Sequence, residues 1–146
     1  MAFDFHFFLS IYQRTTMMHI HVKITKSKKK DKKFTVCFEN GTEIHFGANG
    51  YSDYTIHKDP KRMRNYLIRH GGLLTNNMKR ITDSVSIHKA MLEVIESDKE
   101  VWDLNGLHTA GFWSRWFLWS FPTTREVQKF MKQKFKLNIK MINYRT

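Results

Sequence analysis

The segment Phe34–Phe46, FTVCFENGTEIHF, contains two stretches of alternating apolar and polar residues on either side of Asn40-Gly41. Alternation with a period of two is typical of a strand that buries one face. Asn and Gly both accept a positive φ, so this pair between two such stretches indicates a two-residue hairpin turn. The sequence therefore predicts an antiparallel hairpin with one apolar face, made of Phe34, Val36, Phe38, Ile44 and Phe46.

A third strand is predicted upstream of the hairpin, from His19 to Thr25, because Ile20, Val22 and Ile24 alternate with polar residues. The lysine-rich segment Lys26–Lys33 would connect this strand to the hairpin, since so many charged side chains are not buried. Three strands with one apolar face need a cover from other elements.

Helices downstream can supply that cover. Asp59 is a favourable N-cap, Pro60 suits the first helical position, and Gly71-Gly72 ends the helix that follows. The other predicted helices are Ser84–Ser97, His108–Ser120 and a last one that begins at Thr123 or Thr124. The sequence thus predicts an α+β fold in which a three-stranded antiparallel sheet is packed by about four helices.

The chain of 146 residues is long enough for one domain with its own core. We expect residues 1–17 to form an N-terminal extension or arm, residues 18–137 a single basic α+β domain, and residues 138–146 a basic C-terminal tail. The alternating tail is also a candidate edge strand. An inserted acidic helix is expected around residues 73–107, because six of the 13 Asp and Glu residues lie between Asp83 and Asp103.

Positive charge is the strongest feature of the composition. The formal net charge is +12 at pH 7, which favours an anionic partner such as nucleic acid, an acidic protein surface or anionic lipid. The residues expected to provide electrostatic complementarity lie on the outer face of the helix that follows Pro60, and are Lys61, Arg62, Arg64 and Arg69.

Few residues point to chemistry. Cys37 is the only cysteine, which excludes an internal disulfide and suits a reducing compartment. The eight histidines show no zinc-site spacing, and no phosphate-binding loop motif is present, so we expect no metal site, cofactor or catalytic residue. A nuclease-like enzyme centred on Tyr51, Asp53, His57 and Asp59 is one functional hypothesis. It is weaker than the two hypotheses given below.

The block His108–Pro122, HTAGFWSRWFLWSFP, holds three of the four tryptophans. Tryptophan and arginine dominate protein–protein hot spots, so Trp113, Arg115, Trp116 and Trp119 are candidate partner-binding residues. The alternative is that these rings fill the open face of the sheet. We expect a division in which about two tryptophans are buried and one or two contact a partner.

The N-terminal stretch Phe3–Tyr12, FDFHFFLSIY, is apolar but much shorter than the roughly 20 residues that span a bilayer. It also lacks the basic leader and the cleavage site of a signal peptide. We expect it to dock on a neighbouring subunit or a membrane through Phe5, Phe7 and Phe8.

Three motifs resemble a family of small basic uncharacterised proteins of nucleocytoplasmic large DNA viruses. They are KKDKKF (Lys29–Phe34), HFGANGYSDYTIHKDPKRMRNYLIRH (His45–His70) and TAGFWSRWFLWSFPT (Thr109–Thr123). With the last helix, the resemblance spans most of residues 18–137. In such proteins a short polar link joins the second motif to the third, so residues 73–107 and residues 1–17 look additional in this chain.

The resemblance implies a non-enzymatic minor capsid protein, located in the virion capsid and in the host cytoplasm during assembly. Its implied partners are the major capsid protein and other minor capsid proteins, with the inner viral membrane and nucleic acid as further candidates. This role rests on analogy and not on a site. The alternative is a sequence-independent DNA-binding or genome-packaging protein of the virion core.

Overall fold

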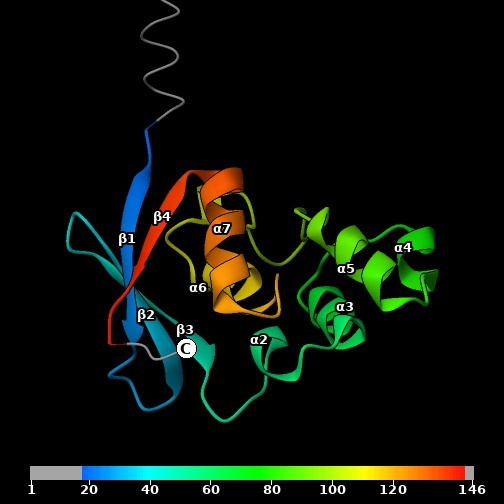
Figure 1. Cartoon of the computed structure of the whole chain (residues 1–146), viewed down its shortest axis with the longest axis horizontal. Helices are drawn as coiled ribbons and strands as arrows, with labels where there is room; N and C mark the ends of the chain where they lie inside the picture. Colours follow the sequence, from blue (N-terminus) through cyan, green and yellow to red (C-terminus); the bar gives the residue numbers. More distant parts are fainter. Residues whose placement is uncertain (1–17, 144–146) are drawn as a thin grey trace, which may run out of the picture.

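A sheet lies at one end of the molecule, two helices pack beside it in the middle, and a group of short helices occupies the other end (Figure 1). This computed structural model describes residues 18–143. The strands are β1 (Ile20–Lys26), β2 (Lys32–Phe38), β3 (Glu43–Ala48) and β4 (Leu137–Met141). The helices are α2 (Tyr54–His57), α3 (Pro60–Arg69), α4 (Asn76–Arg80), α5 (Ser84–Leu92), α6 (Ala110–Trp113) and α7 (Thr124–Phe135), with a 3₁₀ turn η1 (Leu104–Gly106) and a π-helical turn η2 (Ser114–Leu118).

The predicted hairpin is confirmed. Strands β2 and β3 pair antiparallel with Val36 opposite Ile44. The predicted two-residue turn is wrong in length: Phe38 N donates to Thr42 O, which leaves three residues between them, and of the predicted pair only Gly41 has a positive φ, of +88°. Strand β1 pairs antiparallel with β2 on the other side. The apolar residues predicted from the alternation are buried or pack against the buried core, so the sheet covers the core with one face.

The sheet has four strands in the order β3-β2-β1-β4, and β4 runs parallel to β1. The α+β class is therefore confirmed, whereas the prediction of three antiparallel strands is wrong in strand number and in one pairing. A parallel neighbour needs a long crossover connection, and here the helical segments between β3 and β4 provide it. Lys136 adopts a left-handed conformation after α7, and Ile20 N donates a hydrogen bond of 2.8 Å to Lys136 O.

Two of the predicted helices are confirmed with nearly the predicted bounds. In α3 the Asp59 carboxylate accepts a hydrogen bond from Lys61 N, and Pro60 occupies the first turn. In α7 the Thr123 hydroxyl accepts from Glu126 N. The predicted helix Ser84–Ser97 ends early, as α5, because the chain then crosses the C-terminal end of α3, where Ser97 forms a β-bridge with Gly72.

The predicted helix His108–Ser120 consists of two parts. One α-helical turn, α6, begins after the N-cap Thr109 and continues into the wider π turn η2. The short helices α2 and α4 were not predicted, which makes six α-helices instead of about four. They have four and five residues, too few to produce an apolar period in the sequence. Within residues 18–143, no helix has the length and apolar character needed to cross a bilayer.

Candidate partner-binding surface

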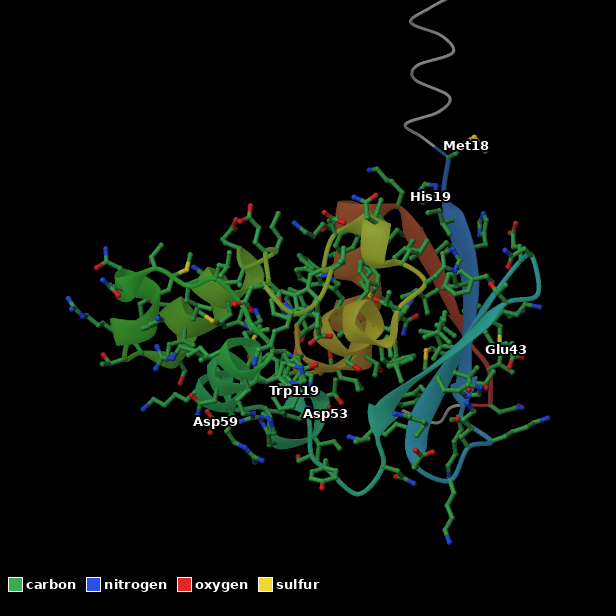
Figure 2. All side chains as sticks on the ribbon, turned by 180° about the vertical axis from the view of Figure 1, so that it is seen from behind. Met18, His19, Glu43, Asp53, Asp59 and Trp119 are labelled. Carbon is green, nitrogen blue, oxygen red and sulfur yellow. The ribbon has the colours of Figure 1, made fainter. Side chains whose placement is uncertain are left out.

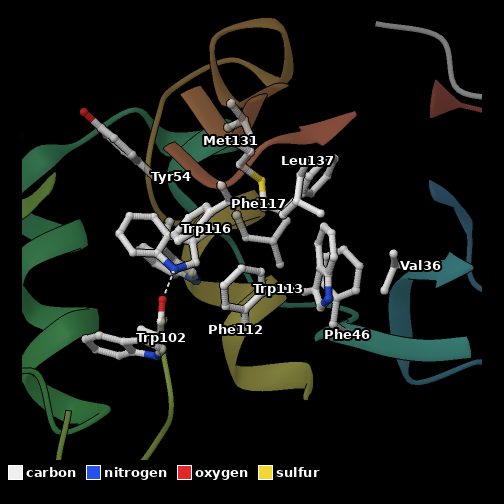
Figure 3. Close-up of a cluster of buried hydrophobic side chains, with 14 of the residues drawn as sticks. Val36, Phe46, Tyr54, Trp102, Phe112, Trp113, Trp116, Phe117, Met131 and Leu137 are labelled. Carbon is white, nitrogen blue, oxygen red and sulfur yellow. Dashed lines mark hydrogen bonds between the residues drawn. The ribbon is translucent and has the colours of Figure 1, made fainter. Parts of the chain in front are cut away.

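The aromatic block lies in the core (Figure 3). Trp113, Arg115 and Trp116 have no exposed surface, and Trp119 is 8% exposed. A side chain without exposed surface cannot contact a partner unless it moves. The prediction that these four residues form a partner anchor is therefore wrong for this conformation, and the expected division of the tryptophans between core and partner is wrong as well.

Burial is complete because the block is surrounded on several sides. Trp113 packs against Phe46 of the sheet, with ring centroids 6.1 Å apart. Trp116 packs against Phe135 of α7, and its indole N–H donates to Trp102 O at 2.7 Å (Figure 3). Trp119 stacks on Tyr66 of α3 at 4.2 Å and 6°. The sequence analysis considered only the open face of the sheet as a surface against which these rings could be buried.

Arg115 is a structural residue. Its guanidinium donates to Trp119 O at 2.7 Å, to Met91 O at 2.6 Å and to Val94 O at 3.2 Å. It also lies 4.1 Å from the ring centroid of Trp116. Burial lowers the pKa of Arg115 to about 9. The side chain gives donors to carbonyl groups at and after the ends of α5 and η2, one of which, Met91 O, also accepts from Val94 N.

The basic residues of α3 divide into two groups. Lys61, Arg62 and Arg69 are exposed. Arg64 is half-buried, and its guanidinium donates to Met78 O at 3.1 Å and to Ile81 O at 2.7 Å. Arg64 therefore fixes α4 to α3, which corrects its predicted role as a free charge.

The arm residues Phe5, Phe7 and Phe8 lie outside the described residues, so the docking role of the arm stays a prediction.

A pocket of about 440 Å³ lies beside α3. The face of α3 that contains Arg62, Asn65 and Arg69 forms one wall, and the end of β3, the loop that follows it and η2 form the others. Figure 2 shows Asp53 and Trp119, both lining residues, close together in this region. The volume lies within the range of small-ligand and peptide pockets.

The acidic side chain of this pocket is already neutralised. Lys33 Nζ lies 2.6 Å from Asp53 Oδ2, with side-chain exposures of 12% and 3%. The other Asp53 oxygen accepts from Thr55 N at 2.9 Å and from the Thr55 hydroxyl. By contrast, the guanidinium groups of Arg62 and Arg69 form no hydrogen bond or ion pair with residues 18–143. The pocket therefore contains two exposed cations that have no partner within residues 18–143.

Three of the four residues of the nuclease-like hypothesis, Asp53, His57 and Asp59, have roles in the local structure. Asp53 and Asp59 act as N-caps of α2 and α3, and Tyr51 is exposed. His57 accepts a hydrogen bond from Asp59 N at 3.0 Å, and burial together with nearby Arg62 lowers its pKa. Among the described residues, no group of three or more His, Cys, Asp or Glu side chains could hold a metal ion. The geometry gives these residues roles in the fold.

The lysine-rich segment Lys26–Lys33 contains a turn that lies next to the loop that follows β3. Asn49 N donates to Asp31 O at 2.9 Å, and the Asn49 amide donates to Lys30 O at 3.1 Å. The side chains of Lys28, Lys29 and Lys30 are exposed. Because Gly47 and Ala48 line the pocket, the turn extends the positive charge beyond the rim at this end of the sheet.

The helices of the segment expected to hold an acidic helix, α4 and α5, contain no Asp or Glu, because the acids flank α5 or follow it. The segment 73–107 is integrated into the fold. Ile87, Met91, Val94 and Trp102 are buried in the common core. Glu100 lies 2.7 Å from His70 at the end of α3, and the Ser97 hydroxyl donates to His70 O at 2.6 Å. This segment therefore helps to position the face of α3 that lines the pocket.

A family of unknown function, DUF5754, matches residues 22–70 of this chain. The match begins in β1 and ends just after α3, so it includes the strand and helix walls of the pocket but neither η2 nor the acidic segment. No curated protein and no solved structure matches the chain significantly.

Proposed function

We propose that the protein is a non-enzymatic structural component of a virion, a minor capsid protein that ties capsomers to their neighbours or to the inner membrane. One observation supports this role most directly: Lys61, Arg62 and Arg69 are exposed on α3 and no acidic side chain of the described chain neutralises them. Unpaired cations on a rigid helix are suited to an acidic surface on a neighbouring protein. The viral setting rests on the resemblance of the three sequence motifs.

The role of the tryptophan block changes within this proposal. Its side chains form the core that holds α3 and the sheet together. We therefore assign partner contacts to the exposed bases, with the N-terminal arm as a second, separate contact. The major capsid protein and other minor capsid proteins are the proposed partners.

The direct test is fractionation of purified particles into shell, membrane and genome core, followed by quantitative mass spectrometry of this chain. Recovery with the shell, at a fixed ratio to the major capsid protein, is expected. A chain that is absent from purified particles would refute the proposal. Deletion of residues 1–16 should weaken incorporation without unfolding the domain, and unchanged incorporation would refute the docking role of the arm.

The alternative is DNA binding, which is favoured by the position of the exposed lysine turn beside the basic pocket rim. This alternative predicts recovery with the genome core. It also predicts an affinity for duplex DNA that is independent of sequence and falls steeply with salt, because each neutralised phosphate releases counterions. An affinity that does not change between about 50 and 200 mM salt would argue against it.

A further inference from the structure

We propose that the pocket beside α3 binds an extended acidic peptide segment of a partner protein, with two carboxylates three residues apart in the segment. The inference rests on the proposed docking function and assigns it to one site. Arg62 and Arg69 would each bind one carboxylate, and Asn65 between them would contact the peptide backbone.

The first support is the position of the two guanidinium groups. Arg62 and Arg69 are seven residues apart on α3, and both line the pocket. Seven residues of helix advance about 10.5 Å and turn through almost two full turns, so both side chains leave the same face. Asn65 lies between them on this face, and it also lines the pocket.

The second support is the charge of the pocket. The carboxylate of Asp53 is held by Lys33 and by the first turn of α2, so its negative charge is already compensated by the charge of Lys33. Arg62 and Arg69 therefore leave the pocket with an excess of two positive charges. Arginine binds carboxylates through two parallel hydrogen bonds, which gives such a site directional preference.

The spacing of Arg62 and Arg69 along α3 favours one backbone conformation of the peptide. Side chains i and i+3 of a polyproline-II segment share one face and lie about 9 Å apart, close to the separation of the two arginines along α3. In a β-strand, side chains on one face are about 6.6 Å or 13 Å apart, which fits less well. The concave shape also favours a protruding segment over a flat surface.

Two synthetic peptides with the same composition test this inference on the full-length protein. Acetyl-Gly-Glu-Pro-Pro-Glu-Gly-amide presents its two carboxylates at i and i+3 in a polyproline-II conformation. Acetyl-Gly-Glu-Glu-Pro-Pro-Gly-amide carries them on adjacent residues. Titration is followed by NMR of the arginine Nε–Hε groups and by calorimetry. We expect tighter binding of the first peptide, with shifts at Arg62 and Arg69.

Matched variants separate the pocket from bulk charge. The double variant Arg62→Gln/Arg69→Gln and the control Arg80→Gln/Arg125→Gln each remove two exposed arginines, and the control residues lie outside the pocket. The pocket variant should weaken the first peptide by about tenfold or more, because two charge-assisted hydrogen-bond pairs are lost. The control should change the affinity by less than about threefold, through long-range electrostatics alone.

Equal weakening by the two double variants, equal affinity for the two peptides, or no binding would overturn the inference. A single-stranded oligothymidylate that binds in the pocket when the peptide does not would overturn it in favour of a nucleic-acid ligand. Because these measurements use purified protein, their failure is distinct from a failure of the proposed capsid role, which is decided by the particle fractionation.

Discussion

Replacement of Asp53 by alanine should destabilise the protein strongly, although the residue lies at the edge of a pocket. The side chain is 3% exposed, and it serves both as the ion-pair partner of Lys33 and as the N-cap of α2. Removing one member of a buried ion pair costs about 3–5 kcal/mol, because the other charge stays in a poorly solvated place. Lys33 borders the pocket and is 12% exposed, so part of its charge can regain water and the lower value applies.

Loss of the N-cap adds about 1 kcal/mol, so Asp53→Ala should lower the free energy of unfolding by about 4 kcal/mol. Asn is also a good N-cap, and Asp53→Asn should therefore lose about 3 kcal/mol, the ion-pair contribution alone. Urea denaturation followed by tryptophan fluorescence measures both values. Such a loss is large against the 5–15 kcal/mol that is typical of folded domains.

A double-mutant cycle of Asp53→Asn with Lys33→Met isolates the interaction between the two charges. If the two charges interact, the double variant should lose clearly less stability than the two single variants lose in total, because neither charge is left without its partner. Additive losses would refute the ion-pair reasoning. A loss below about 1 kcal/mol in Asp53→Ala would also refute it, since that value is expected of the cap alone.

Three further changes test the packing and the electrostatics. Arg115→Met should cost at least about 3 kcal/mol in urea denaturation, because Trp119 O and Val94 O lose the guanidinium donor and Met91 O keeps only Val94 N. The exposed control Arg80→Gln should change stability by less than about 0.5 kcal/mol. Burial lowers the pKa of His88 in the folded state. The contribution of neutral His88 to stability is therefore present above about pH 6.5 and is lost as the pH falls through the lower folded-state pKa. The variant His88→Gln should make the decrease in stability at acid pH less steep. Gly47→Ala should cost about 1–2 kcal/mol, since its φ is +79° and a Cβ would lie 2.8 Å from the Leu118 side chain; a wild-type urea midpoint in this variant would contradict the strain.

Local signals in the sequence predicted the elements that local physics determines. Alternation placed the buried faces of β1, β2 and β3, and Asn40-Gly41 placed the hairpin turn. The sequence Asp59-Pro60 marked the start of α3 because a cap and a proline need only their immediate neighbours. The bases of α3 were also placed correctly on its outer side, except for Arg64.

The features that sequence reasoning missed depend on distant contacts. The parallel pairing of β4 with β1 joins residues more than a hundred positions apart, and no local pattern specifies that partner. Arg115 was predicted to bind a partner because arginine is frequent in hot spots. Two of its acceptors, Met91 and Val94, lie in a segment that was expected to be an insertion, so its role in the core was missed. The charge of the pocket was also missed, because it depends on the ion pair between Asp53 and Lys33. Only the arrangement of the loop and the strand in the folded protein shows this pair.

The distribution of hydrogen bonds separates the bases that the fold requires from those it does not. Lys33, Arg64 and Arg115 each satisfy a carboxylate or carbonyl groups of the described chain, so stability alone explains their charge. The side chains of Arg62 and Arg69 satisfy none within residues 18–143, although they lie on one face of a helix and line the same pocket. Like charges at such a site repel weakly and bring no stability of their own. A ligand with negative charge would offset this repulsion, and for this reason we propose the partner contact at this pocket and not at the buried tryptophans.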